Sequence, residues 1–216
     1  FTFQEVNPQG YLEYLHRKTG LVFVLIPAGT FQMGSHFTEM YRKECEGPRH
    51  EVTLSAFLMA KYEVSQKAWA QVTQVPFESK PRGDIYPVYQ ISWADARRFC
   101  DETGLQLPTE AEWEYACRAG SEGPFDWGTS YDRDYLASEE ENLKFPMKIG
   151  QKKPNGFGLY DMAGNVAEWC NDLFGEYKAQ PQTDPTGAAP TPLMNNRIFR
   201  GGSYQKHYTQ ARSGAR

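Results

Sequence analysis

The sequence lacks long apolar runs, a leader segment and a strong excess of charge. No segment approaches the roughly 18 consecutive apolar residues that a membrane-spanning helix needs, and no basic-then-apolar stretch at the start resembles a signal peptide. The net charge is -4 at pH 7, which argues against the phosphate backbone of a nucleic acid as the main partner. We therefore expect neither a membrane protein nor a nucleic-acid-binding protein.

The residues that most often bind zinc are also scarce. The chain has four cysteines and four histidines, and it contains no CxxC pair. His36, Cys45 and His50 lie together in the charged segment 35–50. Their gaps of nine and five residues match no closed zinc site, so we expect a solvated surface loop there rather than a zinc site.

The sequence does contain enough apolar material for one domain. It holds 216 residues, of which 40% are hydrophobic and 14% aromatic, and it shows no internal repeat. Because the first residue is Phe1 and not Met, we expect the chain to be a piece of a longer protein. We predict a lead-in over residues 1–20 and a single domain over residues 21–216.

Short apolar and β-branched segments predict strands. Leu21–Ile26 is a continuous apolar run, and turn residues lead from it into a second strand at 30–33, so we predict a hairpin. Further strands are predicted at 51–54, 57–60 and 198–204. Three residues near the start have helical spacing, which favours a short helix or a lead-in arm: Tyr11, Tyr14 and Leu15.

Capping residues predict three helices. Ser65 and Ser92 each precede a segment with apolar residues on one helical face. Thr109 and Glu112 form a capping box before a helix that ends at Gly120. The last two are the main helices, and together with short antiparallel strands and a high loop content they indicate an α+β fold.

The loop Asn155–Cys170 combines glycines with two acids. Its glycines permit tight turns, so we expect a buried, folded loop rather than a linker. Asp161 and Glu168 lie seven residues apart, and a loop that folds back could direct both carboxylates, with backbone carbonyls, at one hard cation. The spacing equally fits acids that cap backbone amides, and it leaves both interpretations open.

Two other loops are long. Residues 123–145 are strongly acidic, and we interpret Glu139, Glu140 and Glu141 as a solvated face. Residues 175–196 hold four prolines, which favours an irregular surface excursion.

Several blocks follow one another in a recognisable order. They are IPAGTFQMGS at 26–35, HEVTLSAFLMAKYEVS at 50–65, QLPTEAEWEYACRAG at 106–120, GFGLYDMAGNVAEW at 156–169 and FRGGSY at 199–204. These blocks resemble the formylglycine-generating enzyme family, also called the sulfatase-modifying-factor family. The resemblance covers residues 21–216 and implies a variant of the C-type lectin fold. It does not fix the activity, because the domain serves oxidases, sulfoxide synthases and pure binding proteins.

The resemblance implies a structural calcium ion in the loop Asn155–Cys170. By likeness, Asp161 and Glu168 supply side-chain oxygens while Gly164 and Val166 supply carbonyl oxygens, and calcium accepts about six to eight oxygen ligands. Family members also usually continue past the position of Arg216 to a final strand, which this sequence does not contain.

The resemblance also bears on the cysteines. In secreted members, the positions of Cys100 and Cys117 are disulfide-bonded to the C-terminal segment. Here one partner position is Arg216, and the other lies beyond the sequence. We therefore expect four free, mostly buried thiols and a reducing compartment, the cytoplasm.

The two enzymatic interpretations lack ligands. Formylglycine-generating enzymes bind copper through two cysteines, whose positions are Lys206 and Ala211 here, and neither side chain can replace a thiolate. The iron sulfoxide synthases need three histidine ligands. No HxxxH or HxH pair occurs among the histidines of this chain, which are His16, His36, His50 and His207.

We therefore predict a non-catalytic binding or scaffold domain, a pseudoenzyme whose partner is a protein or peptide. The alternative is a metal-dependent (iron or copper) oxidase or sulfoxide synthase of the same family. The segment 205–210 is polar and aromatic, like the residues of paratope loops. The variable proteins that this chain also resembles diversify the same segment. The predicted contact residues are Gln205, Lys206, His207, Tyr208 and Gln210, beside Trp169 and Tyr204.

Overall fold

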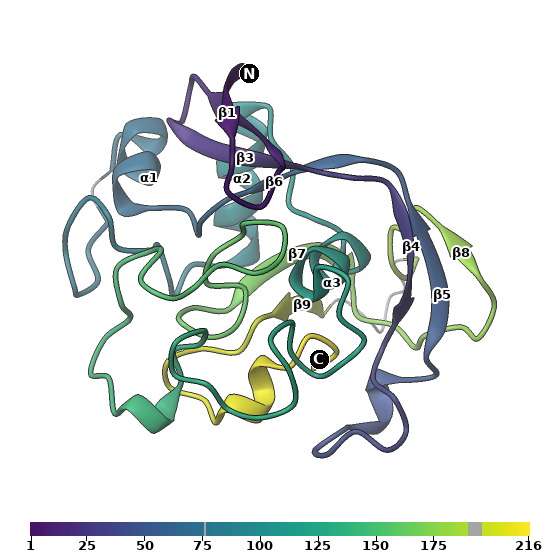
Figure 1. Cartoon of the computed structure of the whole chain (residues 1–216). Helices are drawn as coiled ribbons and strands as arrows, with labels where there is room; N and C mark the ends of the chain where they lie inside the picture. Colours follow the sequence, from purple (N-terminus) through teal and green to yellow (C-terminus); the bar gives the residue numbers. More distant parts are fainter. Residues whose placement is uncertain (76, 190–195) are drawn as a thin grey trace.

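The N-terminal part of the chain forms a four-stranded antiparallel sheet. The computed structural model describes residues 1–75, 77–189 and 196–216. β3 (Leu21–Ile26) lies inside the sheet, and its Val24 and Ile26 are fully buried. The strand order is β1-β2-β3-β6, with β1 at Thr2–Val6, β2 at Leu12–His16 and β6 at Phe57–Ala60 (Figure 1).

Two predictions for this region are wrong. The short helix favoured by the spacing of Tyr11, Tyr14 and Leu15 is instead the strand β2, because pairing with β3 decides the conformation of so short a segment. β4 (Gly29–Met33) follows β3 but does not form a hairpin with it. Both edges of β3 are taken by β2 and β6, so β4 pairs with the next strand, β5 (His50–Leu54).

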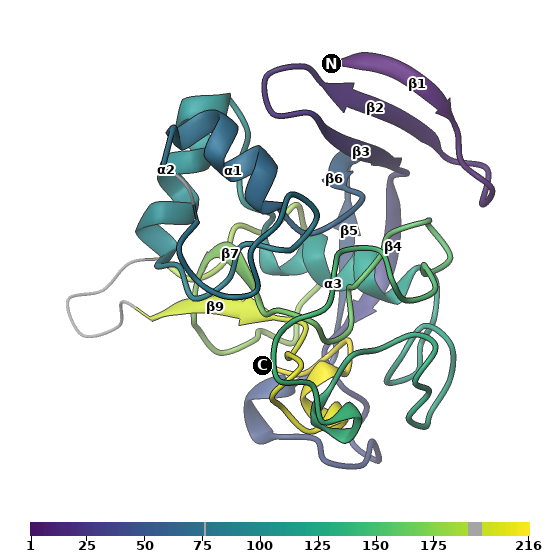
Figure 2. The same ribbon diagram turned by 90° about the vertical axis from the view of Figure 1, so that its left-hand side faces the viewer.

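Two smaller sheets complete the strands. β8 (Gln182–Thr183) pairs in parallel with β5, so the segment 175–196 is not irregular throughout its described part. β7 (Glu168–Leu173) and β9 (Arg197–Arg200) form an antiparallel pair (Figure 2). The predicted strand at 198–204 is thus shorter, since the chain turns at Gly201, where φ is +93.

The three predicted helices are present with their predicted caps. They are α1 (Gln66–Thr73), α2 (Trp93–Thr103) and α3 (Glu110–Arg118). The capping box of α3 is complete: the Thr109 side chain accepts from the Glu112 amide, and the Glu112 carboxylate accepts from the Thr109 amide. α3 carries the fully buried Trp113 into the main core. The α+β fold is confirmed.

Three short 3-10 turns position loops that matter below. They are η1 (Glu44–Glu46), η2 (Glu139–Glu141) and η3 (Tyr208–Ala211). Among the residues that the structure describes, none of the helices has both the length and the apolar character of a membrane span.

Candidate functional site

The loop Asn155–Cys170 is folded and largely buried, as predicted. The Asn155 carboxamide anchors it, because Oδ1 accepts from two loop amides at 3.0 and 3.1 Å and Nδ2 donates to the Ala116 carbonyl of α3 at 2.7 Å. At Gly164 φ is +89, and a Cβ atom there would overlap the backbone of Ala137. Only glycine fits this close approach.

Three carboxylates gather at this loop, and we refer to Glu63, Asp161 and Glu168 as the acid trio. Asp161 is 4% exposed, and its Oδ2 accepts from the amide of Gly150 at 2.6 Å. Glu168 begins β7, and its Oε2 accepts from the indole Nε1 of Trp113 at 2.7 Å.

Glu63 is the member that sequence reasoning missed. It lies before α1, is 6% exposed, and accepts from Asn165 Nδ2 at 2.7 Å and from the Val166 amide at 3.0 Å. The available signal was an acid between apolar and aromatic neighbours at a strand-to-helix connection, where a buried charge needs a partner. Its position about a hundred residues before the loop hid that partner.

Burial raises the pKa of every member of the acid trio. It raises the pKa of Asp161 to about 6 against the opposing effects of the Gly150 amide and Lys152, and that of Glu168 to about 7. The pKa of Glu63 lies well above its ordinary range, because the group is buried and because Asp161 and Glu168 repel its charge. Raised pKa values of this kind are typical of buried acids without a cationic partner.

The donor set of the loop fits a hard cation. Among the described residues, no Lys or Arg forms an ion pair with the acid trio. Within the same residues, the carbonyl oxygens of Gly164 and Val166 accept no hydrogen bond. Two carboxylates and two carbonyl oxygens are ligands that calcium prefers, so the residues predicted to bind it, Asp161, Gly164, Val166 and Glu168, are suited to it in donor chemistry. The three carboxylates of the acid trio are not among the described side chains whose ligand atoms all lie within 4.8 Å of one another.

A second buried group of acids is paired with arginines. We define the arginine cluster by seven residues: Glu46, Glu110, Glu114, Arg118, Arg200, Arg212 and Arg216. Arg200, at 1% exposure, contacts Glu110 at 2.8 Å and Glu114 at 2.6 Å. Burial alone would raise the pKa of Glu114, but Arg118 and Arg200 outweigh it and hold that pKa below its ordinary value.

The arginine cluster corrects one prediction. The segment 35–50 is not a solvated loop throughout, because Glu46 is completely buried against Arg212 and His50 is buried in β5. His36 is exposed and Cys45 half-buried. Within the described part of the chain, these residues are not among the side chains close enough to share a metal ion.

The two positions that carry copper-binding cysteines in the enzymes hold no thiol. Lys206 is exposed, whereas Ala211 is buried in an apolar cluster with Phe125 and Leu136. All four cysteines are free, as predicted, and three are buried. Burial raises the pKa of Cys117 to about 12, so this thiol is protonated at neutral pH.

The predicted contact residues divide into exposed and supporting side chains. Gln205, Lys206 and Gln210 are exposed, and His207 and Tyr208 are half-buried. The supporting side chains are Tyr204, at 5% exposure, and Trp169. The Trp169 indole donates to the Ile91 carbonyl at 3.0 Å and lines an apolar cavity of about 460 Å³ between α1, α2 and the first sheet.

A second exposed segment meets this one at Tyr41, whose ring lies 6.2 Å from that of His207. Phe37 and Met40, four and one residues before Tyr41, are 81% and 72% exposed. Arg212 donates to the Tyr41 carbonyl at 2.9 Å and thereby ties the two segments together. We define the contact surface as residues 205–210 with Phe37, Met40 and Tyr41.

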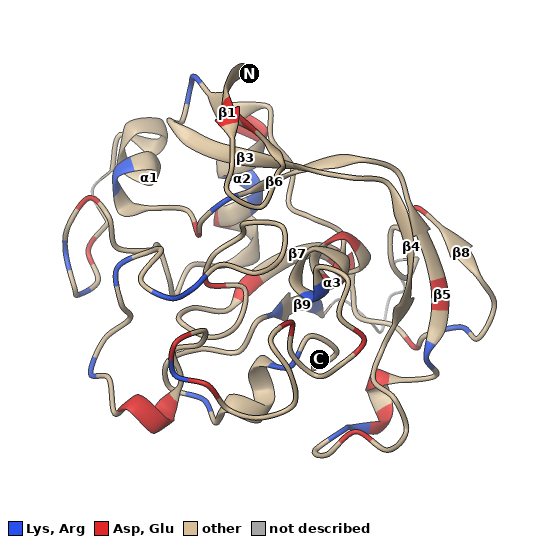
Figure 3. Cartoon of the chain, viewed as in Figure 1, with Lys and Arg blue, Asp and Glu red and all other residues tan. Residues whose placement is uncertain are grey.

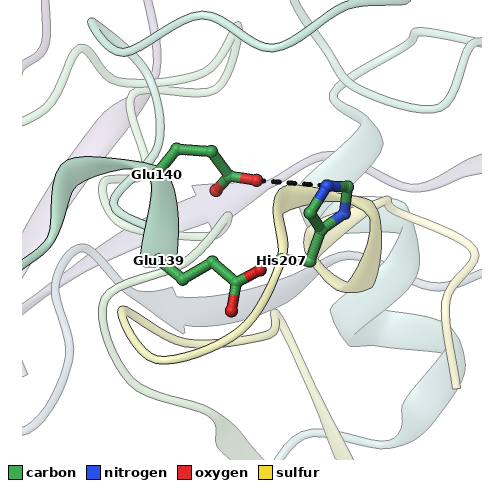
Figure 4. Close-up of side chains that lie close together, drawn as sticks. All are labelled: Glu139, Glu140 and His207. Carbon is green, nitrogen blue, oxygen red and sulfur yellow. Dashed lines mark ion pairs between the residues drawn. The ribbon is translucent and has the colours of Figure 1, made fainter.

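η2 brings two acids to His207. Figure 3 shows η2 as an acidic turn. Glu139 and Glu140 are exposed, as expected for a solvated face, but the prediction is wrong for Glu141, whose side chain is 11% exposed because it pairs with Lys152 at 2.8 Å. Nε2 of His207 lies 3.3 Å from a Glu140 oxygen, and one ligand atom from each of the three residues lies within 4.8 Å of the others (Figure 4). The histidine is therefore not an isolated surface residue, and one imidazole with two carboxylates is a donor set that divalent metals accept.

Comparison with known proteins decides the family. The model of the sulfatase-modifying factor enzyme 1-like domain matches residues 9–216. The chain belongs to this family. A formylglycine-generating enzyme of Streptomyces coelicolor is 30% identical to this sulfatase-modifying-factor domain over 254 residues, which cover 85% of this chain and 79% of the relative.

Other relatives of the domain are not named as active enzymes. The inactive C-alpha-formylglycine-generating enzyme 2 of Bos taurus is 28% identical over 229 residues, covering 74% of this chain and 72% of that protein. The structure of Treponema denticola variable protein 1 superposes with a TM-score of 0.77 at 23% identity, covering 94% and 90% of the two chains. That likeness shows a shared fold. The family and the fold expected from the sequence are thus confirmed.

Proposed function

We propose that this sulfatase-modifying-factor domain is a non-catalytic binding domain whose partner is a protein or peptide. The observation that carries the proposal is the pair Lys206 and Ala211, where the copper-binding oxidases of the family have two cysteines. An exposed ammonium and a buried methyl group cannot bind Cu(I) as thiolates do. The protonated, buried thiol of Cys117 cannot substitute for them.

The contact surface supports a binding role. It combines exposed aromatic and apolar side chains with polar ones, a composition typical of protein interfaces. Its backbone is held in place, because the Glu139 amide donates to the Lys206 carbonyl at 3.1 Å and Arg212 holds the Tyr41 carbonyl. A surface that is ordered before binding loses less conformational entropy when the partner arrives.

The scaffold under this surface is proposed to bind calcium at Asp161, Gly164, Val166 and Glu168. The support is the donor set and the absence, within the described residues, of any ion pair to the acid trio. A cation bound only by the folded state stabilises that state, so its role is structural. The four free cysteines support our proposal of a reducing compartment, the cytoplasm.

The catalytic part of the proposal is tested by mass spectrometry. The purified domain is incubated with copper, oxygen and a cysteine-containing sulfatase-type peptide, and the peptide mass is followed. We expect no change, because Lys206 and Ala211 leave copper without its two thiolates. Conversion of the cysteine thiol to an aldehyde lowers the peptide mass by about 18 daltons and requires thiolate chemistry. A mass loss of this size would overturn the proposal.

The binding part is tested by peptide selection on the immobilised domain. Peptides selected on the parent protein should lose binding to a Tyr41→Ala/His207→Ala variant. The matched control is Phe3→Ala, which removes an aromatic side chain of 52% exposure from β1. Selected peptides that bind all three proteins equally would contradict the assignment of the contact surface.

The alternative remains a metal-dependent oxidase or sulfoxide synthase of the same family. The observation that favours it is the arrangement of Glu139, Glu140 and His207, which offers a divalent metal one nitrogen and two oxygens. The discriminating experiment is to titrate the domain with iron(II) under nitrogen and then admit oxygen and a thiol substrate. Substrate oxidation that His207→Ala abolishes would support the enzyme and contradict the binding domain.

A further inference from the structure

A second cavity, of about 240 Å³, lies at the N-terminal end of α3. Its wall includes His50 of β5, Asp172 of β7, Tyr177, Glu110 and Arg216. No residue of the acid trio or of the contact surface lines it. The cavity is therefore separate from the proposed calcium site and the contact surface, and it borders the arginine cluster at Glu110 and Arg216.

Three side chains in this wall carry a buried polar atom that has no hydrogen-bond partner in the described part of the chain. They are Nε2 of His50, Oδ1 of Asp172 and Oη of Tyr177. His50 and Asp172 are each 2% exposed. Seven such atoms occur among the described residues, and three of them lie around one cavity. Buried polar atoms are normally paired, so this concentration indicates an occupant that the chain itself does not supply.

All three atoms can accept a hydrogen bond. Nδ1 of His50 lies 3.0 Å from the Pro48 carbonyl, which can only accept, so Nδ1 carries the proton and Nε2 of the neutral ring is an acceptor. Asp172 accepts the Glu110 amide with Oδ2, which leaves Oδ1 as an acceptor. The Tyr177 hydroxyl can also accept. The complementary ligand therefore supplies hydrogen-bond donors.

The wall carries more acids than bases, because Glu110, Asp172 and Glu176 line it together with Lys178 and Arg216. The Arg216 guanidinium is engaged, because it contacts Glu110 at 2.8 and 3.0 Å and lies 4.1 Å from the centre of the Tyr177 ring. Asp172 forms no ion pair with any described residue. Burial, with repulsion from Glu110, raises the pKa of Asp172 to about 6, so the group is still ionised at neutral pH.

We propose that this cavity binds a small primary amine in its ammonium form. An ammonium group has three N–H donors and no acceptor, which matches the acceptors of His50, Asp172 and Tyr177, and its charge offsets that of Asp172. The carbon chain of the amine lies against the apolar part of the wall, which Met33 and Leu173 provide. The volume corresponds to about eight water molecules at ~30 Å³ each, so the ligand has few heavy atoms.

The test is a titration of the intact domain with n-butylammonium, followed by the amide resonances of residues that line the cavity. We expect saturable shifts, and at least about 10-fold weaker binding of two matched probes. Tetramethylammonium has the same charge without N–H donors, and n-butanol has the same chain without the charge. No saturable shift, or equal responses to all three probes, would mean that the cavity holds only water and would overturn the proposal.

Two variants keep the test independent of folding. Tyr177→Phe removes only the hydroxyl and should weaken n-butylammonium binding by about 10-fold. It should not lower Tm, because the hydroxyl has no partner in the described protein. The control Tyr14→Phe, on β2, should leave the affinity unchanged. An unchanged affinity in Tyr177→Phe contradicts the proposal even if the parent protein binds the amine.

Discussion

The arginine cluster and the acid trio are both groups of largely buried carboxylates, but only the first contains its own cations. Glu114 is completely buried, yet its pKa is held below the ordinary value by Arg118 and Arg200. Glu168 has an indole N–H as its hydrogen-bond donor, and burial raises its pKa to about 7. The carboxylate is thus ion-paired by the chain in one place, and in the other it forms no ion pair with any described residue.

This difference suggests a structural role for the arginine cluster and a binding role for the acid trio. The arginine cluster joins η1, α3, β9 and the C-terminal segment through Glu46, Glu114, Arg200 and Arg212, so it closes the fold from within. The acid trio joins the segment before α1 to the central loop, and among the described residues it has no ion-pair partner. We therefore interpret the first as a clamp, and we propose the second as a cation site.

The largest expected effect comes from breaking the clamp. Arg200→Met leaves the buried Glu110 and Glu114 without one of their cations, which should lower the free energy of unfolding by about 3–5 kcal/mol. Arg97→Ala, which removes an exposed pair with Asp101, is the control and should cost about 0.5 kcal/mol or less. Urea denaturation measures both. Equal losses in the two variants would show that the cluster is no clamp.

Removing a charged group from the acid trio should raise the free energy of unfolding in chelator, whereas removing one from the arginine cluster lowers it. Glu168→Gln keeps an oxygen for the Trp113 indole but removes one of the repelling charges. In a chelator we expect the variant to be more stable than the parent protein. In calcium at about 100 times its Kd, the parent gains about 2.7 kcal/mol and the variant does not. The control is Glu122→Gln, which changes an exposed acid and should keep the calcium response of the parent. If Glu168→Gln were stabilised by calcium as much as the parent, the acid trio would not be a calcium site.

A smaller effect is expected on the pH dependence of stability in chelator. The pKa of Glu168 is raised from 4.5 to about 7, so the folded state binds its proton more tightly than the unfolded state does. The resulting stability is fully present below pH ~4.5 and is lost as the pH rises through ~7. Thermal unfolding between pH 5 and 8 should therefore show a falling contribution that is reduced in Glu168→Gln. If Tm changed with pH in the same way in the two proteins, the charge of Glu168 would not contribute to the pH dependence of stability.

Local features of both regions could be predicted from the sequence, but their partners could not. The capping box of Thr109 and Glu112, the buried strand at Leu21–Ile26 and the folded loop around Gly164 all depend on neighbouring residues. The pairing of β4 depends on which edges of β3 are already taken. Glu63 and Arg212 are ordinary charged residues in the sequence, and only the fold brings each to its partner.

Sequence-based prediction of the contact residues in the C-terminal segment has the same limit, because it does not show which distant residues lie beside them. The absence of thiols at Lys206 and Ala211 could be read from the sequence against the family pattern. The neighbouring exposed side chains could not, because Phe37 and Met40 lie more than 150 positions earlier in a segment predicted to be only a solvated loop. The segment that carries them reaches His207 through Tyr41, whose carbonyl accepts from Arg212.

The most direct test of the proposed cation site is calorimetric titration of calcium into chelator-stripped protein. We expect one saturable site in the parent protein and in Arg97→Ala, and its loss in Glu168→Gln and Asp161→Asn. Saturable binding that persists unchanged in both acid variants, or no calcium binding by the parent, would contradict the claim that the acid trio forms a cation site.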